Sequence, residues 1–164
     1  MTVHPLDPER LVRALDAQGV RYVLVGALGA RLFGFPRVTA DADITPLADP
    51  ENLERLASAL RALDAKVFTE SVPEGLAFDV SAAMLSRAPL WNLVTLAGRL
   101  DLVFMPKGTG GYADLAPRAA TFELFGTTVL VATLEDVLRM KEASARPQDL
   151  QDAIVIREML LSST

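Results

Sequence analysis

The sequence predicts an α/β fold (α+β in the stricter usage), in which helices pack on a small mixed β-sheet. Short aliphatic and β-branched runs alternate with longer segments whose apolar residues recur at helical spacing. The chain has 164 residues and is 51% hydrophobic, which is enough for one well-buried core. We therefore expect a single domain over residues 1–164, because two domains in this length would be unusually small.

The elements of the first half follow from apolar spacing and turn residues. Leu11, Val12 and Leu15 lie on one helical face, and Gly19 is a stop signal. A turn from Pro46 to Pro50 precedes the third helix. The predicted helices are 8–18, 27–33 and 51–63, and the predicted strands are 21–25, 42–45, 66–69 and 76–80.

The second half begins with a connector and ends in two helices. Thr133 with Asp136 three residues later resembles a capping box, and Pro147 suits the first turn of a helix. The glycines at 108, 110 and 111 predict a flexible loop. The predicted order is a connector 84–90, strands 91–97 and 99–104, loop 107–111, a short helix 115–120, strand 128–131, and helices 134–144 and 147–161.

The amino-acid composition limits which metal ligands and which partners the protein can have. Cysteine is absent and His4 is the only histidine, which excludes thiolate and histidine metal clusters; we expect His4 to be a solvated terminal residue. Any metal must have oxygen ligands, which favours Mg²⁺ or Mn²⁺. The net charge of −5 argues against a nucleic-acid coat protein and suits a nucleotide delivered with its own metal.

No membrane partner is expected from the sequence. No apolar run approaches the roughly 20 residues that span a bilayer. Residues 1–10 carry prolines and acidic side chains and lack the pattern of a signal peptide. We therefore expect a cytoplasmic protein.

The stretch from Tyr22 to Ile44 carries the clearest chemical signal. An apolar strand leads into Gly26 and a small-residue helix, whose start offers free N–H groups and a positive dipole end to a phosphate. Asp41 and Asp43 project to one side of an extended segment, while Ala42 and Ile44 point into the core. A phosphate cradle followed by paired carboxylates is what metal-dependent transfer from a nucleotide requires. The stretch predicts a nucleotidyltransferase.

A third carboxylate is expected from a neighbouring strand. Asp101 lies in the otherwise apolar run 100–104, where an unpaired charge is costly. Asp79, between Phe78 and Val80, is the alternative in a similar setting. The sequence favours Asp101, to complete the metal site and to draw a proton from the attacking hydroxyl, but leaves Asp79 open.

A final constellation lies on the two C-terminal helices. Lys141 is on the first, and Asp149 and Asp152 share a face of the second. Lys141 is suited to neutralise phosphate charge. Asp152 either orients Lys141 or acts on the acceptor hydroxyl; the alternative interpretation of the whole constellation is an interhelical salt bridge.

Two blocks of the chain resemble the signatures of AbiEii-type nucleotidyltransferases, the group that includes MenT-like toxins of toxin–antitoxin systems. The glycine turn and the paired aspartates form the first block, the tail forms the second, and the glycine-rich middle also fits. The residues that carry the resemblance are Val25–Leu28 with Gly34–Asp43, Gly110–Tyr112 with Leu115 and Arg118, and Leu134–Val137 through Lys141 with Ala145–Asp152.

The resemblance implies a polymerase-β-like nucleotidyltransferase core. It implies a nucleoside triphosphate and Mg²⁺ as partners, transfer to the 3′ end of tRNA, and a cognate antitoxin protein. Alanine stands after the glycine where the family usually has glycine or serine, so a hydroxyl contact would be lost. The implied roles are triphosphate binding at Gly26 and Ala27, support of the phosphates by Arg37 and Thr39, metal binding at Asp41 and Asp43, and catalysis by Lys141 and Asp152.

Two other functions stay open. The acceptor could be a protein side chain or a small molecule, although the Gly26-Ala27 start weakens the protein-modifying variant. A non-catalytic binding module would be expected to lack acidic residues, whereas Asp41, Asp43 and Asp101 are present.

Overall fold

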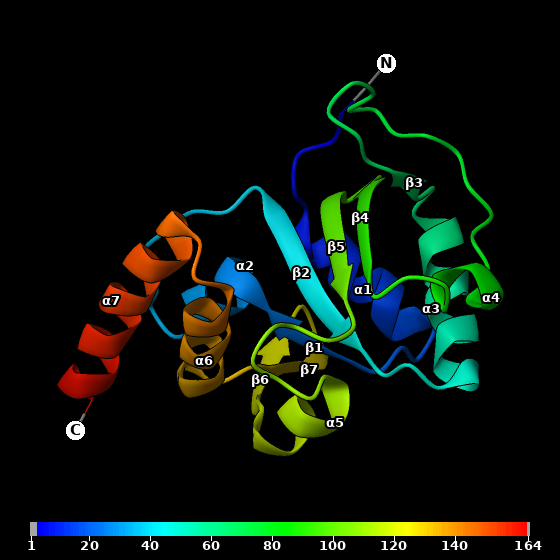
Figure 1. Cartoon of the computed structure of the whole chain (residues 1–164). Helices are drawn as coiled ribbons and strands as arrows, with labels where there is room; N and C mark the ends of the chain where they lie inside the picture. Colours follow the sequence, from blue (N-terminus) through cyan, green and yellow to red (C-terminus); the bar gives the residue numbers. More distant parts are fainter. Residues whose placement is uncertain (1–2, 164) are drawn as a thin grey trace.

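A computed structural model describes residues 3–163 and contains one seven-stranded mixed sheet with the strand order β3-β4-β5-β2-β1-β7-β6. The strands are β1 (Tyr22–Val25), β2 (Asp41–Pro46), β3 (Lys66–Val67), β4 (Leu90–Thr95), β5 (Gly98–Val103), β6 (Ala120–Leu124) and β7 (Thr127–Val131). The helices are α1 (Pro8–Ala17), α2 (Gly26–Arg31), α3 (Pro50–Ala62), α4 (Ala82–Leu85), α5 (Tyr112–Leu115), α6 (Leu134–Ser144) and α7 (Pro147–Ser162), with a 3₁₀ turn η1 (Ala116–Arg118) (Figure 1). The α/β prediction and the mixed sheet are confirmed.

The centre of the sheet combines parallel and antiparallel pairs. β1 is antiparallel to β2 and parallel to β7, and β2 is parallel to β5. In this register Asp43 is the partner of Val25 on one side and of Asp101 on the other. The two predicted carboxylate strands are therefore neighbours.

One face of the sheet is sealed by α1 and α3. Leu24, Ile44 and Leu102 point to this side and are 3% or less exposed, packed in one cluster with Leu15 and Leu56 of the two helices. Ala42 lies in the same core, so the prediction that it and Ile44 face inward is confirmed. In Figure 1, α1 lies behind β4 and β5.

The opposite face is covered over only part of its width. A second apolar cluster joins Val23 and Val25 of β1 to residues of α5, α6 and α7, and contains no residue of β4 or β5. α6 and α7 pack against each other and lie together at the left of Figure 1. Within residues 3–163, β2, β5 and β4 thus contribute no buried residue to this second cluster, and alternate residues of these strands are accessible on this face.

Helix boundaries match the predictions closely because the caps are local. Asp7, Asp49 and Thr133 each accept a hydrogen bond from a backbone N–H in the first turn. The two C-terminal helices begin at Leu134 and Pro147, as predicted.

Three predicted elements are wrong. Residues 76–80 form no strand, since within this segment only Leu76 makes a β-bridge, to Val67. The connector 84–90 begins instead inside α4, and its last residue opens β4. The helix predicted at 115–120 ends early at η1, where Pro117 removes a backbone donor, and β6 follows. Alternation of buried-side Phe122 and Leu124 with exposed residues was the overlooked strand signal.

No helix within residues 3–163 is long and apolar enough to cross a membrane.

Candidate active site

A cleft of about 510 Å³ lies over β2, β5 and β4, on the sheet face opposite α1 and α3. Its walls come from β1, β2, β4 and β5, from the loop that follows β5, and from α6 and α7. Gly26, Asp43, Asp101 and Lys141, all singled out by sequence, line it together. The remaining lining residues are Val25, Pro89, Leu90, Asn92, Val103, Met105, Pro106, Lys107, Val137, Met140, Ser144, Arg146 and Asp149.

Asp43 and Asp101 form a close carboxyl pair at the base of the cleft. They are register partners on parallel strands, and their side chains share a hydrogen bond. Burial first, and then the negative charges of Asp101 and Asp41, raise the pKa of Asp43 to about 7. Burial also raises the pKa of Asp101, against the opposing effect of Arg99. The environment of the pair therefore favours the neutral form of these carboxyls.

Positive charge compensates the pair only in part, from Arg99 beside Asp101 and from Lys141 beside Asp43. Oδ1 of Asp101 is buried without a hydrogen-bond partner, and the nearest cationic atom, Nη2 of Arg99, is 3.9 Å away. The guanidinium of Arg99 instead stacks 3.6 Å from the ring centroid of Phe68. A divalent cation would supply the partner that this carboxylate oxygen lacks.

The ligand set of such a cation is small. Within residues 3–163, no three acidic or histidine side chains are grouped as a complete metal site. Asp41 lies on the same sheet face, one pleat from Asp43, and its charge acts on both partners of the pair, but it does not line the cleft. Two protein carboxylates with water and phosphate oxygens are nevertheless a usual Mg²⁺ environment.

Gly26 makes room for Asp43. Its φ is +71°, a left-handed conformation that favours glycine, and a Cβ built there would lie 2.2 Å from Oδ2 of Asp43. The glycine thus lets the first turn of α2 approach the carboxyl pair. Ala27, the other residue expected at the triphosphate, is buried in the second core and does not line the cleft.

Lys141 reaches the cleft from α6 and is held by α7. Its Nζ lies 3.3 Å from Oδ1 of Asp149 and 3.0 Å from Oδ2 of Asp152. The buried Asp149 also accepts hydrogen bonds from Ser144 and Arg146. Although burial acts to raise it, these bonds and Lys141 lower the pKa of Asp149 to about 2. The positive charge on Lys141 in turn partly offsets the raised pKa of Asp43.

Asp152, Arg37 and Thr39 have supporting positions. Asp152 is 4% exposed and accepts two hydrogen bonds from the guanidinium of Arg37, of 3.2 and 2.7 Å. Thr39 bonds through its hydroxyl to the backbone N–H and C=O of Asp41. None of the three lines the cleft. The ion pairs of Lys141 with Asp149 and Asp152 join the two C-terminal helices. The same ion pairs orient Lys141, so the two interpretations of this constellation do not exclude each other.

Asp79 lies away from the pair. It is exposed in the loop before α4, where it accepts a hydrogen bond from the hydroxyl of Ser81. Of the two carboxylates left open by the sequence, the structure brings Asp101 beside Asp43.

Sequence reasoning missed part of the cleft. Asn92 is the β4 partner of Asp101 and lines the cleft with an exposed amide. Leu90, Val103 and Met105 add an apolar wall. The available signal was the alternation of side chains within residues 90–103. It shows which residues share a face of the sheet, but it does not show which face is open.

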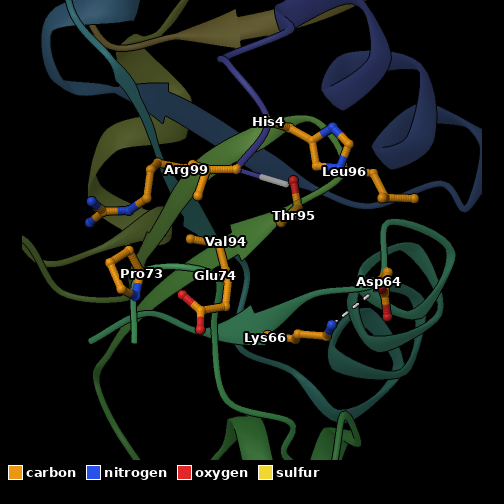
Figure 2. Close-up of a pocket in the computed structure, with 10 residues that line it drawn as sticks. His4, Asp64, Lys66, Pro73, Glu74, Val94, Thr95, Leu96 and Arg99 are labelled. Atoms are coloured by element: carbon orange, nitrogen blue, oxygen red, sulfur yellow. Dashed lines mark ion pairs between the residues drawn. The ribbon is translucent and has the colours of Figure 1, made fainter. Parts of the chain in front are cut away.

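A second, much smaller cavity of about 60 Å³ lies at the other end of β4 and β5 (Figure 2). It is lined by His4, Lys66, Glu74 and Arg99 among others, and Lys66 forms an ion pair with Asp64 at 3.7 Å. His4 is half-buried there, so its prediction as a solvated residue is wrong. The cavity is too small for a nucleotide.

The comparisons with known proteins leave the family open. No family model matches the chain, and a search of curated proteins finds no match.

Proposed function

We propose that this protein is a metal-dependent nucleotidyltransferase with a polymerase-β-like core. The observation that carries the proposal is the register pair of Asp43 and Asp101, with an unpartnered buried Oδ1 on Asp101, beside Gly26 in a cleft that Lys141 also lines. Closely placed carboxyls with raised pKa values are typical of sites that bind a cation or transfer a proton. The cleft volume of about 510 Å³ suits a nucleotide.

Asp43 and Asp101 would hold Mg²⁺ (or Mn²⁺), with Asp41 adding negative charge from the same face. Bound Mg²⁺ supplies Lewis-acid polarisation of the α-phosphate and screens its negative charge. Asp43 must lose its proton before it can bind the ion. The affinity of the protein for the ion is therefore expected to fall as pH drops below about 7.

The side chains divide the remaining tasks. Lys141, oriented by Asp149 and Asp152, stabilises negative charge on the departing pyrophosphate. Gly26 leaves space and backbone N–H groups for the phosphate chain. The acceptor oxygen forms a bond to the α-phosphorus as the bond to pyrophosphate breaks, and Asp101 takes the acceptor's proton.

The resemblance noted in the sequence leads us to propose the 3′ end of tRNA as the acceptor and a toxin–antitoxin setting with a cognate antitoxin partner. Lys107, exposed in the glycine-rich loop at the cleft, is positioned to contact a polyanion.

The first experiment measures transfer of label from nucleoside triphosphates to total tRNA with Mg²⁺. Asp43→Asn is expected to lower transfer by at least about 100-fold, since it removes charge needed at the reaction centre. Asp79→Asn, an equally conservative change at the exposed aspartate, is the matched control and should retain wild-type activity. Equal activity of the two variants would remove the carboxyl pair from the mechanism.

Ion binding is tested separately by calorimetry without nucleotide. Mg²⁺ or Mn²⁺ should bind wild type and the Asp79→Asn variant more tightly than Asp43→Asn.

Transfer of label to protein instead of RNA would indicate the protein acceptor. A chain that binds neither ion nor triphosphate and transfers no label would contradict catalysis and favour a binding module. Growth arrest on induced expression, relieved by the neighbouring gene, tests the toxin setting.

A further inference from the structure

An apolar cavity of about 300 Å³ lies on the sealed side of the sheet, opposite the cleft. Its walls come from α1, β1, α2, β2 and the turn between β6 and β7. Leu15, Leu24 and Ile44 form its deep end and are at most 3% exposed. Leu28 of α2 and Leu32, the residue that follows α2, are half-buried nearer the surface. The cavity therefore runs from the solvent into the main core.

The size and lining of the cavity favour an apolar occupant. An engineered apolar cavity of about 150 Å³ stays dry and binds benzene. This one has twice that volume, and alkyl walls around empty space lose the dispersion contacts that a packed core provides. An apolar molecule that fills it removes this apolar surface from water, which gives a favourable free energy of binding.

Two hydrogen-bond donors interrupt the apolar wall. Among residues 3–163, Arg31 is the only charged residue that lines the cavity, and it is exposed; one of its nitrogens, Nη1, donates to the carbonyl of Pro36. Tyr22 also lines the wall, and its hydroxyl has no side-chain hydrogen bond within residues 3–163. Burial first, and then Asp16, raise the pKa of Tyr22, so its hydroxyl keeps its proton at neutral pH. Asp16 itself accepts a hydrogen bond from Thr127.

The mouth of the cavity is framed by a strained turn. Phe125 and Gly126 both have positive φ, 54° and 80°, as a two-residue type I′ hairpin requires. This conformation is uncommon for a bulky side chain, yet it places Phe125 against the cavity, 40% exposed. The hydrogen bond between Thr127 and Asp16, 2.6 Å long, ties the turn to α1. A residue held at a conformational cost beside an opening is a feature that ligand sites share.

We propose that this cavity binds a free single-chain carboxylic acid of roughly eight to twelve carbons, a length scaled from the benzene-binding cavity. The alkyl chain lies against Leu15, Leu24 and Ile44. The carboxylate accepts hydrogen bonds from the remaining N–H groups of Arg31 and from Tyr22, the charge-assisted pairing that guanidinium favours. This site is independent of nucleotidyl transfer, since none of its residues lines the cleft.

The test is titration with decanoate below its micelle concentration, followed by methyl NMR. Saturable shifts are expected for the methyl groups of Leu15 and Leu24. Leu28→Trp fills the cavity and should abolish the shifts, and Leu32→Phe, a smaller change, should weaken binding. Leu76→Trp is the matched control, because Leu76 is 47% exposed and far from the cavity lining, and it should bind as wild type does.

The head group is tested with a second pair of variants. Arg31→Met should weaken decanoate binding about tenfold, as expected for loss of a hydrogen bond to a charged group, and leave 1-decanol unaffected. Arg10→Met, at an exposed arginine of α1, should leave both unaffected. Absence of saturable shifts, or equal binding by wild type, Leu28→Trp and Leu32→Phe, would overturn the proposal. Unchanged decanoate affinity in Arg31→Met would overturn the choice of a carboxylate.

Discussion

Asp43 illustrates how one buried carboxyl can lower the stability of a fold. Its carboxyl lies in a protein environment that favours the neutral form, whereas in the unfolded chain it ionises near pH 3.8. As pH rises from about 4 to about 7, the unfolded state loses its proton first, so the free energy of unfolding falls. The folded protein is thus penalised at neutral pH for keeping two carboxyls together without a cation.

Replacing Asp43 by Asn should therefore stabilise the metal-free protein while removing activity. We expect a gain of about 1–3 kcal/mol at pH 8, which shrinks toward zero near pH 3, where the Asp43 carboxyl is largely protonated in both the folded and the unfolded state. Urea unfolding at the two pH values measures it. Asp79→Asn should change stability by less than about 0.5 kcal/mol at either pH, as surface substitutions do. A gain in stability that does not depend on pH would contradict the raised pKa of Asp43.

At the scale of elements, α6 and α7 are joined by apolar packing and, at one end, by a cluster of charges. Asp149 lies in the first turn of α7, where the helix dipole also favours a carboxylate, and it bonds to Lys141 and Ser144 of α6. Arg37, from the segment before β2, adds the bond to Asp152. The same ion pairs that orient Lys141 thus hold the two helices together.

This arrangement predicts an acid-sensitive helix pair. Because the folded pKa of Asp149 is about 2 and its ordinary value is 3.8, its contribution of about 2 kcal/mol is complete above pH 4 and is lost as pH falls toward 2. Asp149→Asn should lower the free energy of unfolding by about 2 kcal/mol at pH 7 and show less acid dependence. Thermal melts measure this loss, and Glu158→Gln, at an exposed position of α7, is the control in them. An equal loss at pH 2.5 and pH 7 would show that packing and not charge is responsible.

Over the whole molecule, the two faces of the sheet differ in what they bury. The sealed face holds the main core with α1 and α3, while the cleft side leaves apolar residues accessible. Leu56 of α3 is 0% exposed, whereas Leu90 at the cleft is 49% exposed. Stability should therefore depend far more on the first face than on the second.

A matched pair of leucine substitutions measures this difference. Leu56→Ala should cost about 2–5 kcal/mol, because it removes a fully buried side chain and leaves a cavity. Leu90→Ala should cost less than about 1 kcal/mol and retain the fold. Denaturant midpoints report both. Similar losses would mean that the cleft wall is part of the core.

The sequence predicts local features of this protein well and long-range pairing poorly. Helix caps and the alternation of Asp43 with Ile44 depend on neighbours in the chain, so their positions could be predicted. The parallel pairing of β2 with β5, which places Asp101 beside Asp43, joins distant segments whose register no local pattern encodes. Arg37 was assigned to phosphate for the same reason, since its partner Asp152 is distant in sequence.

The alternation of residues 41–44 along β2 also limits how the length of this strand can change. Ala42 and Ile44 lie in the main core, whereas Asp43 lines the cleft on the opposite face. Adding or deleting one amino acid within the strand would exchange these sides, driving carboxyls among leucines and aliphatic groups into the cleft. Such indels should be far less tolerated there than around exposed Val38 and Ala40, where the chain has no fixed pleat to disturb.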